Sequence, residues 1–328
     1  MGAKSSIAWT NSTWTPIRAR IKKDAAEIAR QKGYTSLIQI AQKMQGRVGP
    51  HCEKVSPGCE HCYSESNNER CLPNNGTGLP FDRRVWDLVD MELDEKILEQ
   101  PLHWKKPRRV FVCSQTDLFG EFVPDAMIAA MFSTMARCPQ HTFQVLTKRA
   151  ERMCDFSMCS LDISQKSREA YRSFGGSELP GPHWPLPNVW MGVSCEDQQR
   201  ANERIPHLLK TPAAVSFVSL EPLLGPILLP QPSIDWVIVG GESGPGARPM
   251  APEWARSIRD QCQAAGVPFF FKQWGNWRAT EPTRAQVEHG MNVPVGDGTH
   301  HRMFRSSRAC GRVLDGRTWD EMPKETRA

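Results

Sequence analysis

Short runs of apolar residues alternate with longer segments of helical periodicity along most of the chain. The runs are rich in β-branched and aromatic residues and are apolar on both faces, which is typical of buried parallel strands. Six of them are predicted to be strands: Val110–Ser114, Phe143–Thr147, Val189–Ser194, Val215–Leu220, Trp236–Gly240 and Val267–Lys272. A seventh strand is expected near Ile7–Trp14.

Three segments between these strands carry an apolar stripe at helical spacing, at residues 124–137, 196–210 and 252–265. In the first, Pro124 stands where a first helical turn accepts proline. Strands that alternate with helices of this length indicate right-handed parallel crossovers. The fold class is therefore α/β, and seven strands favour a β/α barrel, with an open doubly wound sheet as the alternative.

Two segments depart from this alternation. Residues 17–51 are basic and are predicted to form a helical insertion, either a helical pair packed on the barrel or an arm that binds nucleic acid. Near the other end, residues 303–319 are predicted to form a small hairpin that turns at Asp315-Gly316. We expect residues 1–275 to be the barrel and residues 276–328 to be an extension that covers it.

Arginines alternate with aromatic residues in this extension. They either form a solvated basic face or contact the backbone and bases of a nucleic acid. The residues concerned are Arg302, Arg305, Arg308, Arg312 and Arg317, with Phe304 and Trp319.

The composition is that of a globular protein, with 39% hydrophobic and 23% charged residues among 328. Forty-one basic and 36 acidic side chains give a net charge of +5, which permits a phosphate-bearing partner without requiring one. No apolar run approaches the roughly 20 residues that span a bilayer. The chain starts without a secretory signal, so we expect a cytoplasmic protein whose 11 cysteines are mostly reduced.

Polar residues directly follow nearly every predicted strand. Active sites on parallel β/α folds gather at the carboxyl ends of the strands, so these residues are candidates for the site. Loops of this kind also supply helix caps, which is the alternative reading of any single one. The candidates are Gln115, Asp117, Lys148, Arg149, Glu196, Glu221, Gly240, Gly241, Glu242 and Ser243.

Cys52, Cys59 and Cys62 are spaced as C-x6-C-x2-C, and Pro57-Gly58 can turn the chain between them. The spacing predicts that three thiolates converge on one metal centre. Zinc would need a fourth ligand, for which His51, His61 and Cys71 are candidates. A four-iron cluster held by three cysteines would leave one iron open to an exogenous ligand.

These cysteines and several other motifs resemble the phage-associated three-Cys-motif family, a poorly characterised group that is similar to the radical S-adenosylmethionine (SAM) enzymes. The spacing of the first two cysteines differs from the three residues usual in that superfamily, and His61 stands where an aromatic residue is usual. The matching motifs are Ile7–Thr10, Thr13–Pro16, Val55–Cys59, Cys62-Tyr63, Leu146–Arg149, Leu220–Leu224, Val239–Gly244, Lys272–Gly275 and Leu314–Arg317.

The resemblance implies a β/α barrel, partial as in radical SAM enzymes, with a [4Fe-4S] cluster on the three cysteines and SAM on the open iron. A carboxylate, Glu221 or Glu196, would hold the ammonium group of SAM, and a cation, Lys148 or Arg149, its carboxylate. The glycine-rich segment Gly240-Gly241-Glu242-Ser243 would flank the adenosine or a phosphate. Asp117 and Gln115 would face the substrate as the catalytic residues.

The function implied is a radical-SAM-like enzyme that generates a 5′-deoxyadenosyl radical, with a nucleic-acid base or nucleotide as substrate. An electron donor and a partner protein are expected, and a membrane is not. The alternative is a binding module in which zinc or an inert cluster braces the loop, and in which DNA, RNA or a protein partner is bound without redox chemistry.

Overall fold

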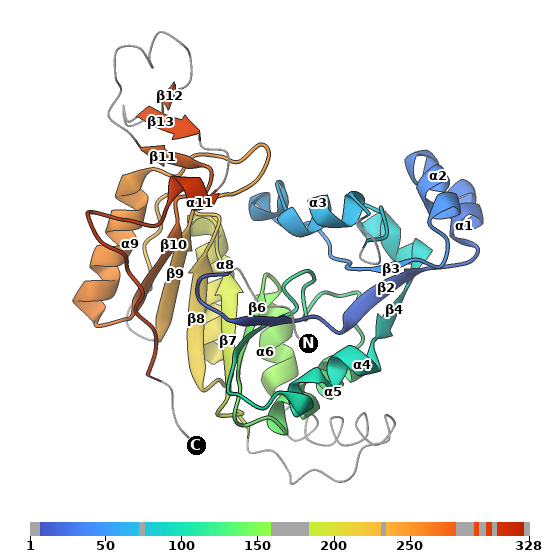
Figure 1. Cartoon of the computed structure of the whole chain (residues 1–328), viewed down its shortest axis with the longest axis horizontal. Coiled ribbons are helices and arrows are strands. Elements are labelled where there is room, and N and C mark those ends of the chain that lie inside the picture. Colours follow the sequence, from blue (N-terminus) through green and yellow to red (C-terminus); the bar gives the residue numbers. More distant parts are fainter. Residues whose placement is uncertain are drawn as a thin grey trace.

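The computed structural model describes residues 7–71, 76–158, 184–230, 234–279, 292–294, 300–303 and 307–324. Its centre is a curled sheet of seven parallel strands, and their order in the sheet is their order in the chain. A doubly wound sheet would reverse that order at a switch point, so the sheet is an open half-barrel (Figure 1). The strands are β1 (Ser12–Trp14), β5 (Arg109–Val112), β6 (Thr142–Thr147), β7 (Val189–Ser194), β8 (Val215–Leu220), β9 (Trp236–Gly240) and β10 (Phe269–Gln273).

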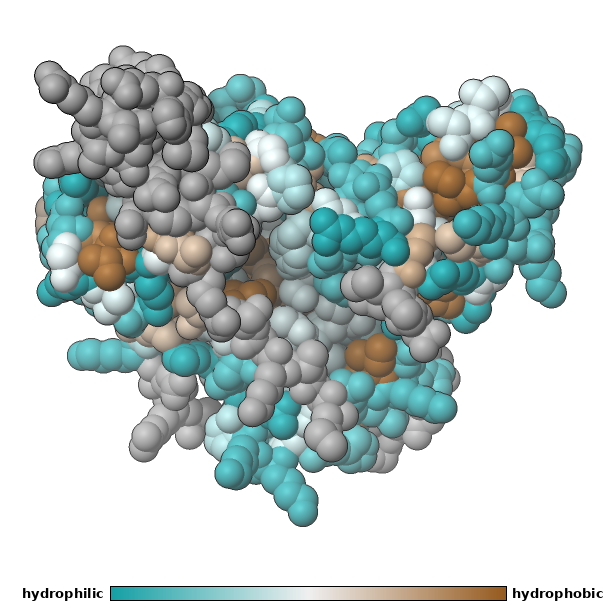
Figure 2. Space-filling view, turned by 45° about the horizontal axis from the view of Figure 1, so that its top comes forward, coloured by the Kyte–Doolittle hydropathy of each residue, from teal (hydrophilic) through white to brown (hydrophobic). Residues whose placement is uncertain are grey.

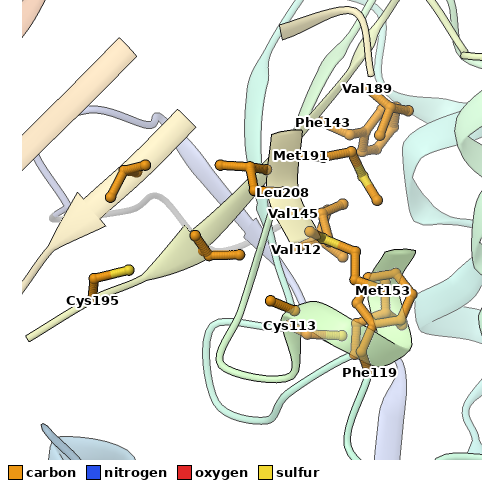
Figure 3. Packing of buried hydrophobic residues seen from close by; sticks show 14 of the residues in the cluster. Val112, Cys113, Phe119, Phe143, Val145, Met153, Val189, Met191, Cys195 and Leu208 are labelled. Atoms are coloured by element: carbon orange, nitrogen blue, oxygen red, sulfur yellow. The ribbon is translucent and has the colours of Figure 1, made fainter. Parts of the chain in front are cut away.

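The convex face of the sheet carries the main core. Figure 3 shows its residues Val112, Phe143 and Met191 packed with Met153 and Leu208 from helices. The helices of this layer are α5 (Asp125–Ala136), α6 (Ala150–Met158), α8 (Gln198–Lys210) and α9 (Pro252–Ala265). Since alternate strand residues face opposite sides of a sheet, the remaining strand positions point into the half-barrel.

Large aromatic side chains fill the concave side. Trp190, Phe217, Trp236 and Phe270 form one buried cluster with Trp9. A Cβ on Gly192 of β7 would lie 2.5 Å from the Phe217 ring of β8, so the lack of a side chain at Gly192 makes room for this ring. The lumen is therefore closed below the carboxyl ends of the strands.

Residues 17–51 are not a wholly helical insertion. Helices α1 (Ala25–Gln31) and α2 (Thr35–Lys43) are present, but strands β2 (Ile17–Ile21) and β3 (Val48–Gly49) flank them. β2 pairs antiparallel with β3 and with β4 (Val89–Leu93). These helices and strands, together with residues 79–88, form a lobe that has a buried cluster of its own. The alternation of buried Ile17, Ala19 and Ile21 with arginines is a strand pattern, which a helical reading overlooks.

The lobe stands beside the half-barrel (Figures 1 and 2). Several of its basic side chains are paired internally, for example Arg20 with Glu92 and Lys32 with Asp87. These pairs reduce the positive charge available to a nucleic acid. Between β3 and β5 the chain also forms η1 (Pro57–Cys59), α3 (Tyr63–Glu69), η2 (Arg83–Leu88), α4 (Glu95–Leu98) and η3 (Gln100–His103).

The C-terminal segment pairs with the edge of the half-barrel. The Phe271 N–H donates to the Trp319 carbonyl at 2.9 Å, and the Trp236 indole N–H donates to the Glu321 carbonyl at 2.9 Å. Trp319 is buried against Phe269, with ring centroids 5.7 Å apart. The segment thus covers the edge strand β10, which would otherwise expose unpaired backbone groups.

The predicted turn at Asp315-Gly316 is present, with φ of 50° and 80°, and Leu314 N–H donates to the Arg317 carbonyl at 3.0 Å. The prediction of a hairpin over 303–319 is wrong beyond that turn. β13 (His300–Met303) pairs with β11 (Trp277–Ala279) and β12 (Asn292–Pro294), and α11 (Ser307–Cys310) follows. The edge of β10 provides a better partner for the last residues than a short hairpin would.

Two of the predicted basic residues stack on aromatic rings within the fold. The Arg317 guanidinium lies 3.5 Å from the centroid of Trp319, and that of Arg312 lies 5.1 Å from the centroid of Phe270. Phe304 and the side chains of Arg302, Arg305 and Arg308 lie outside the described residues. No helix in the described part of the chain has the length and apolar character needed to cross a bilayer.

We predict that Trp319→Ala destabilises the fold by about 3–5 kcal/mol, because it removes a buried ring that holds the last segment on β10. Val313→Ala, at a side chain that is 51% exposed in the same segment, should change the stability by about 0.5 kcal/mol or less. Urea unfolding measures both. Equal losses for the two variants would contradict the packing role of Trp319.

Candidate functional site

A cavity of about 420 Å³ lies at the carboxyl ends of the parallel strands. The cysteine loop, defined as residues 52–62, forms one wall, and the strand ends form the others. Glu196 and Gly240 adjoin this cavity without lining it. The other predicted site residues all line it: Cys52, Cys59, Cys62, Gln115, Asp117, Lys148, Arg149, Glu221, Gly241, Glu242 and Ser243.

The three cysteines of the loop are free, half-buried thiols. Burial, with the charge of Asp117 second, raises the pKa of Cys52 to about 12, and burial also raises the pKa of Cys62. Among the described residues, no three His, Cys, Asp or Glu side chains are already gathered as a metal site. The sulfur donor set fits iron or zinc, whose binding would require the thiols to approach and lose their protons.

The three candidates for a fourth zinc ligand are in different surroundings. His61 lines the cavity and packs against Gly246, where a Cβ would lie 2.8 Å from the imidazole. The His51 ring instead packs between Phe81 and Phe122, with centroids 6.2 and 4.7 Å away. Cys71 is not part of the cavity wall. His61 is therefore the one candidate that shares the cavity with the cysteines.

Asp117 is a hub that joins the ends of β5 and β6. Its carboxylate accepts from the Thr147 hydroxyl at 2.6 Å, from the Lys148 N–H at 3.0 Å and from the Phe119 N–H at 3.0 Å. The Arg149 guanidinium donates to it at 3.2 Å. With both oxygens occupied in this way, Asp117 is suited to positioning its neighbours, and the predicted catalytic role would require these bonds to break.

Arg149 connects this hub to the cysteine loop. Its other terminal nitrogen donates to the Glu53 carbonyl at 3.3 Å and lies 3.5 Å from the Glu53 carboxylate. The three side chains are between 8% and 13% exposed, so they form a buried triad of charges. Arg149 therefore fixes the residue next to Cys52 rather than facing the cavity as an uncommitted cation.

Glu196 holds the middle of the cysteine loop from the end of β7. It accepts from the Gly58 N–H at 3.2 Å and from the Arg204 guanidinium at 3.0 Å. Burial alone would raise the pKa of Glu196, but Arg204, the Ser56 hydroxyl, the charge of Lys148 and the Gly58 N–H bring it below its ordinary value. The residue is fully buried and ionised, and it holds the turn that carries Cys59.

Glu242 performs a similar task from the end of β9, through Arg248. The guanidinium donates to Glu242 at 2.5 and 2.8 Å. It also donates to the Pro57 carbonyl at 2.8 Å and to the Glu60 carboxylate at 2.9 Å. These contacts lie on both sides of Cys59, so Arg248 clamps the loop to the glycine-rich segment.

The glycines of that segment serve close packing of the backbone. A Cβ on Gly241 would lie 2.0 Å from the Trp274 carbonyl oxygen, and a Cβ on Gly275 would lie 2.1 Å from that of Glu242. The loops after β9 and β10 are therefore in contact at glycines. Gly240 lies beside the Glu221 side chain, because a Cβ added to Gly240 would lie 3.1 Å from an oxygen of the Glu221 carboxylate.

The cavity is also lined by polar side chains that make no bond to the cysteine loop, among them Glu221, Lys272, Lys148 and Gln115. Glu221 pairs with Lys272 at 2.7 Å across the ends of β8 and β10. In the described part of the chain, the Lys148 ammonium makes no ion pair and the Gln115 carboxamide makes no hydrogen bond. These groups are available to a ligand.

Sequence reasoning missed the two arginines that neutralise the buried carboxylates. Arg204 and Arg248 lie eight and six residues after Glu196 and Glu242, within or before helices that look like ordinary outer elements. Since a carboxylate placed at a buried strand end needs a partner, a search for nearby cations could have found them.

A family model described as a protein of unknown function (DUF5131) matches residues 40–323, and the chain belongs to that family. No curated protein and no solved structure matches the chain.

We predict that Arg149→Met destabilises the protein by about 3–5 kcal/mol, because it leaves the buried carboxylates of Asp117 and Glu53 without a counter-charge. Lys148→Met removes the adjacent positive charge, which pairs with no described carboxylate, and should cost about 0.5 kcal/mol or less. Chemical denaturation of both variants checks this. A loss for Lys148→Met as large as that for Arg149→Met would contradict the triad.

We also predict an acid-sensitive contribution from His51. Burial, and next the charge of Arg149, lowers the pKa of His51 from 6.5 to about 4. Between these values the unfolded chain binds a proton that the folded chain does not, so stability present above pH 6.5 is lost as the pH falls towards 4. The loss attributable to His51 should reach about 3 kcal/mol.

His51→Phe should remove this contribution while keeping an aromatic ring between Phe81 and Phe122. The measurement is the free energy of unfolding of the metal-free variant and the metal-free parent protein from pH 7.5 to pH 4. Replacement of the exposed His103 by Phe serves as the control. Parallel pH curves for His51→Phe and the parent would show that His51 is not the titrating group.

Proposed function

We propose that this member of the DUF5131 family is a radical-SAM-like enzyme with a four-iron cluster on Cys52, Cys59 and Cys62. The observation that carries the proposal is that three free thiols line one strand-end cavity, on a loop that Arg149, Glu196 and Arg248 bond to the strand ends. The resemblance to radical SAM enzymes supports the identity of the cluster. When bound and reduced, such a cluster would supply the electron that cleaves SAM to methionine and a 5′-deoxyadenosyl radical.

The contacts divide the candidate ligands of the SAM methionine group into two classes. Glu196 and Arg149 are bonded to the cysteine loop and help to keep it in place. Glu221 and Lys148 line the cavity without bonding that loop. We therefore assign the ammonium group of SAM to Glu221 and its carboxylate to Lys148, by charge-assisted hydrogen bonds.

Lys272 would keep Glu221 ionised and in place, since the two side chains are paired at 2.7 Å. The aromatic filling of the lumen, which includes Trp9 and Phe217, would keep water away from the cavity floor. A nucleic-acid base or nucleotide is the proposed substrate. An external electron donor would reduce the cluster.

The test is anaerobic purification followed by iron and sulfide analysis, and then a single-turnover assay for 5′-deoxyadenosine with SAM and dithionite. We expect about four irons per chain. Cys52→Ala, Cys59→Ala and Cys62→Ala should each lose most of the iron and all of the 5′-deoxyadenosine. Cys71→Ala, a cysteine outside the cavity wall, should retain both.

Lys148→Met should keep the cluster but weaken SAM binding by about 10- to 100-fold, because it removes one charge-assisted hydrogen bond. A colourless zinc protein would contradict the proposal. A brown protein that cannot cleave SAM would also contradict it and would favour a binding module braced by an inert cluster.

A further inference from the structure

Tyr63 presents a fixed aromatic ring at the cavity. Its side chain lines the cavity and is 51% exposed, while its hydroxyl donates to the Ser114 carbonyl. The next residue, Ser64, donates its hydroxyl to the Gln115 carbonyl at 2.9 Å. Two consecutive residues of α3 are thus fastened to two consecutive residues after β5. An exposed ring held at its far end loses little conformational freedom when a ligand covers it.

The second of these bonds holds the backbone of Gln115 against the start of α3. The Gln115 side chain lines the cavity and is half-buried. Within the described residues its carboxamide has no hydrogen-bond partner, so it offers two N–H donors and a carbonyl acceptor. Asp117, two residues on, differs because four protein donors already occupy its carboxylate.

A ring face and an unoccupied amide together match the chemistry of a nucleobase. Bases stack on tyrosine, and an amide can pair with the donors and acceptors along a base edge. We propose that Tyr63 and Gln115 form a subsite for one unpaired nucleobase, on which Tyr63 stacks and whose edge Gln115 binds. This inference rests on the proposed function, because it names the substrate class of the same cavity.

The base must be single-stranded or flipped out of a duplex, since a stacked and paired base exposes neither face to a side chain. The test is fluorescence anisotropy of a short fluorescein-labelled single-stranded DNA with the full-length protein, and an RNA of the same sequence distinguishes the two nucleic acids. Tyr63→Ala should weaken binding by about 5- to 150-fold. Tyr63→Phe keeps the ring and should stay within about 3-fold of the parent.

Tyr34→Ala is the matched control, because that tyrosine lies in the α1–α2 lobe and donates to Asp87 at 3.0 Å. It should bind the probe as the parent protein does. Gln115→Glu replaces two N–H donors by acceptors and should change the ranking of the four nucleoside monophosphates as competitors.

Equal binding by Tyr63→Ala and the parent would overturn the inference, and so would an abasic strand that competes as well as the normal one. A third contrary result would be that Tyr63→Ala weakens only SAM and adenosine, since the ring would then serve the cofactor. These measurements need neither cluster nor reductant. A failure of the radical chemistry with an intact effect of Tyr63 on base binding would therefore be distinguishable from a failure of the subsite.

Discussion

Carboxylates buried at the ends of parallel strands require counter-charges, and in this protein the arginines that supply them determine where the cysteine loop lies. Arg149 joins Asp117 to Glu53, and Arg248 joins Glu242 to Glu60. Glu196, neutralised by Arg204, bonds the loop directly at Gly58. Apart from the exposed Arg248–Glu60 contact, these pairs are costly to bury and more costly to break, so the loop is attached to three strand ends by interactions that cannot be lost singly without penalty.

This arrangement changes how strand-end residues are interpreted. The carboxyl end of a parallel strand is where a catalytic residue is expected, but it is equally the place from which a side chain can hold a loop over the barrel. Asp117, Glu196 and Arg149 hold the loop, whereas Glu221, Lys148 and Gln115 remain turned to the cavity without such bonds. Both groups contain an acidic and a basic side chain shortly after a strand, and their hydrogen-bond partners distinguish them.

Most of the fold could be predicted from the sequence, because the parallel strands are buried on both faces and are therefore apolar along their whole length, as in β7. The insertion was predicted less well: its basic segment was expected to be helical, but in the short strand β2 buried residues alternate with arginines. The candidate residues were found as a set, since strand ends meet at one edge. Their individual roles depended on Arg204 and Arg248, which only a search for cations close to the buried carboxylates would have identified.

The closed lumen limits how a cofactor and a substrate can share this site. Trp9, Trp190 and Trp236 occupy the space below the cavity, so both molecules have to enter between the cysteine loop and the strand ends. The loop must be in place for its thiols to face the cavity, and the bonds of Arg149 and Glu196 to the loop hold it there. Tyr63 directly follows this loop, at the start of α3, with half of its side chain exposed, so a substrate that reaches the cavity can stack on it. Under the proposed function, attachment of the loop, binding of the cofactor and contact with the substrate would thereby all depend on one short segment of the chain.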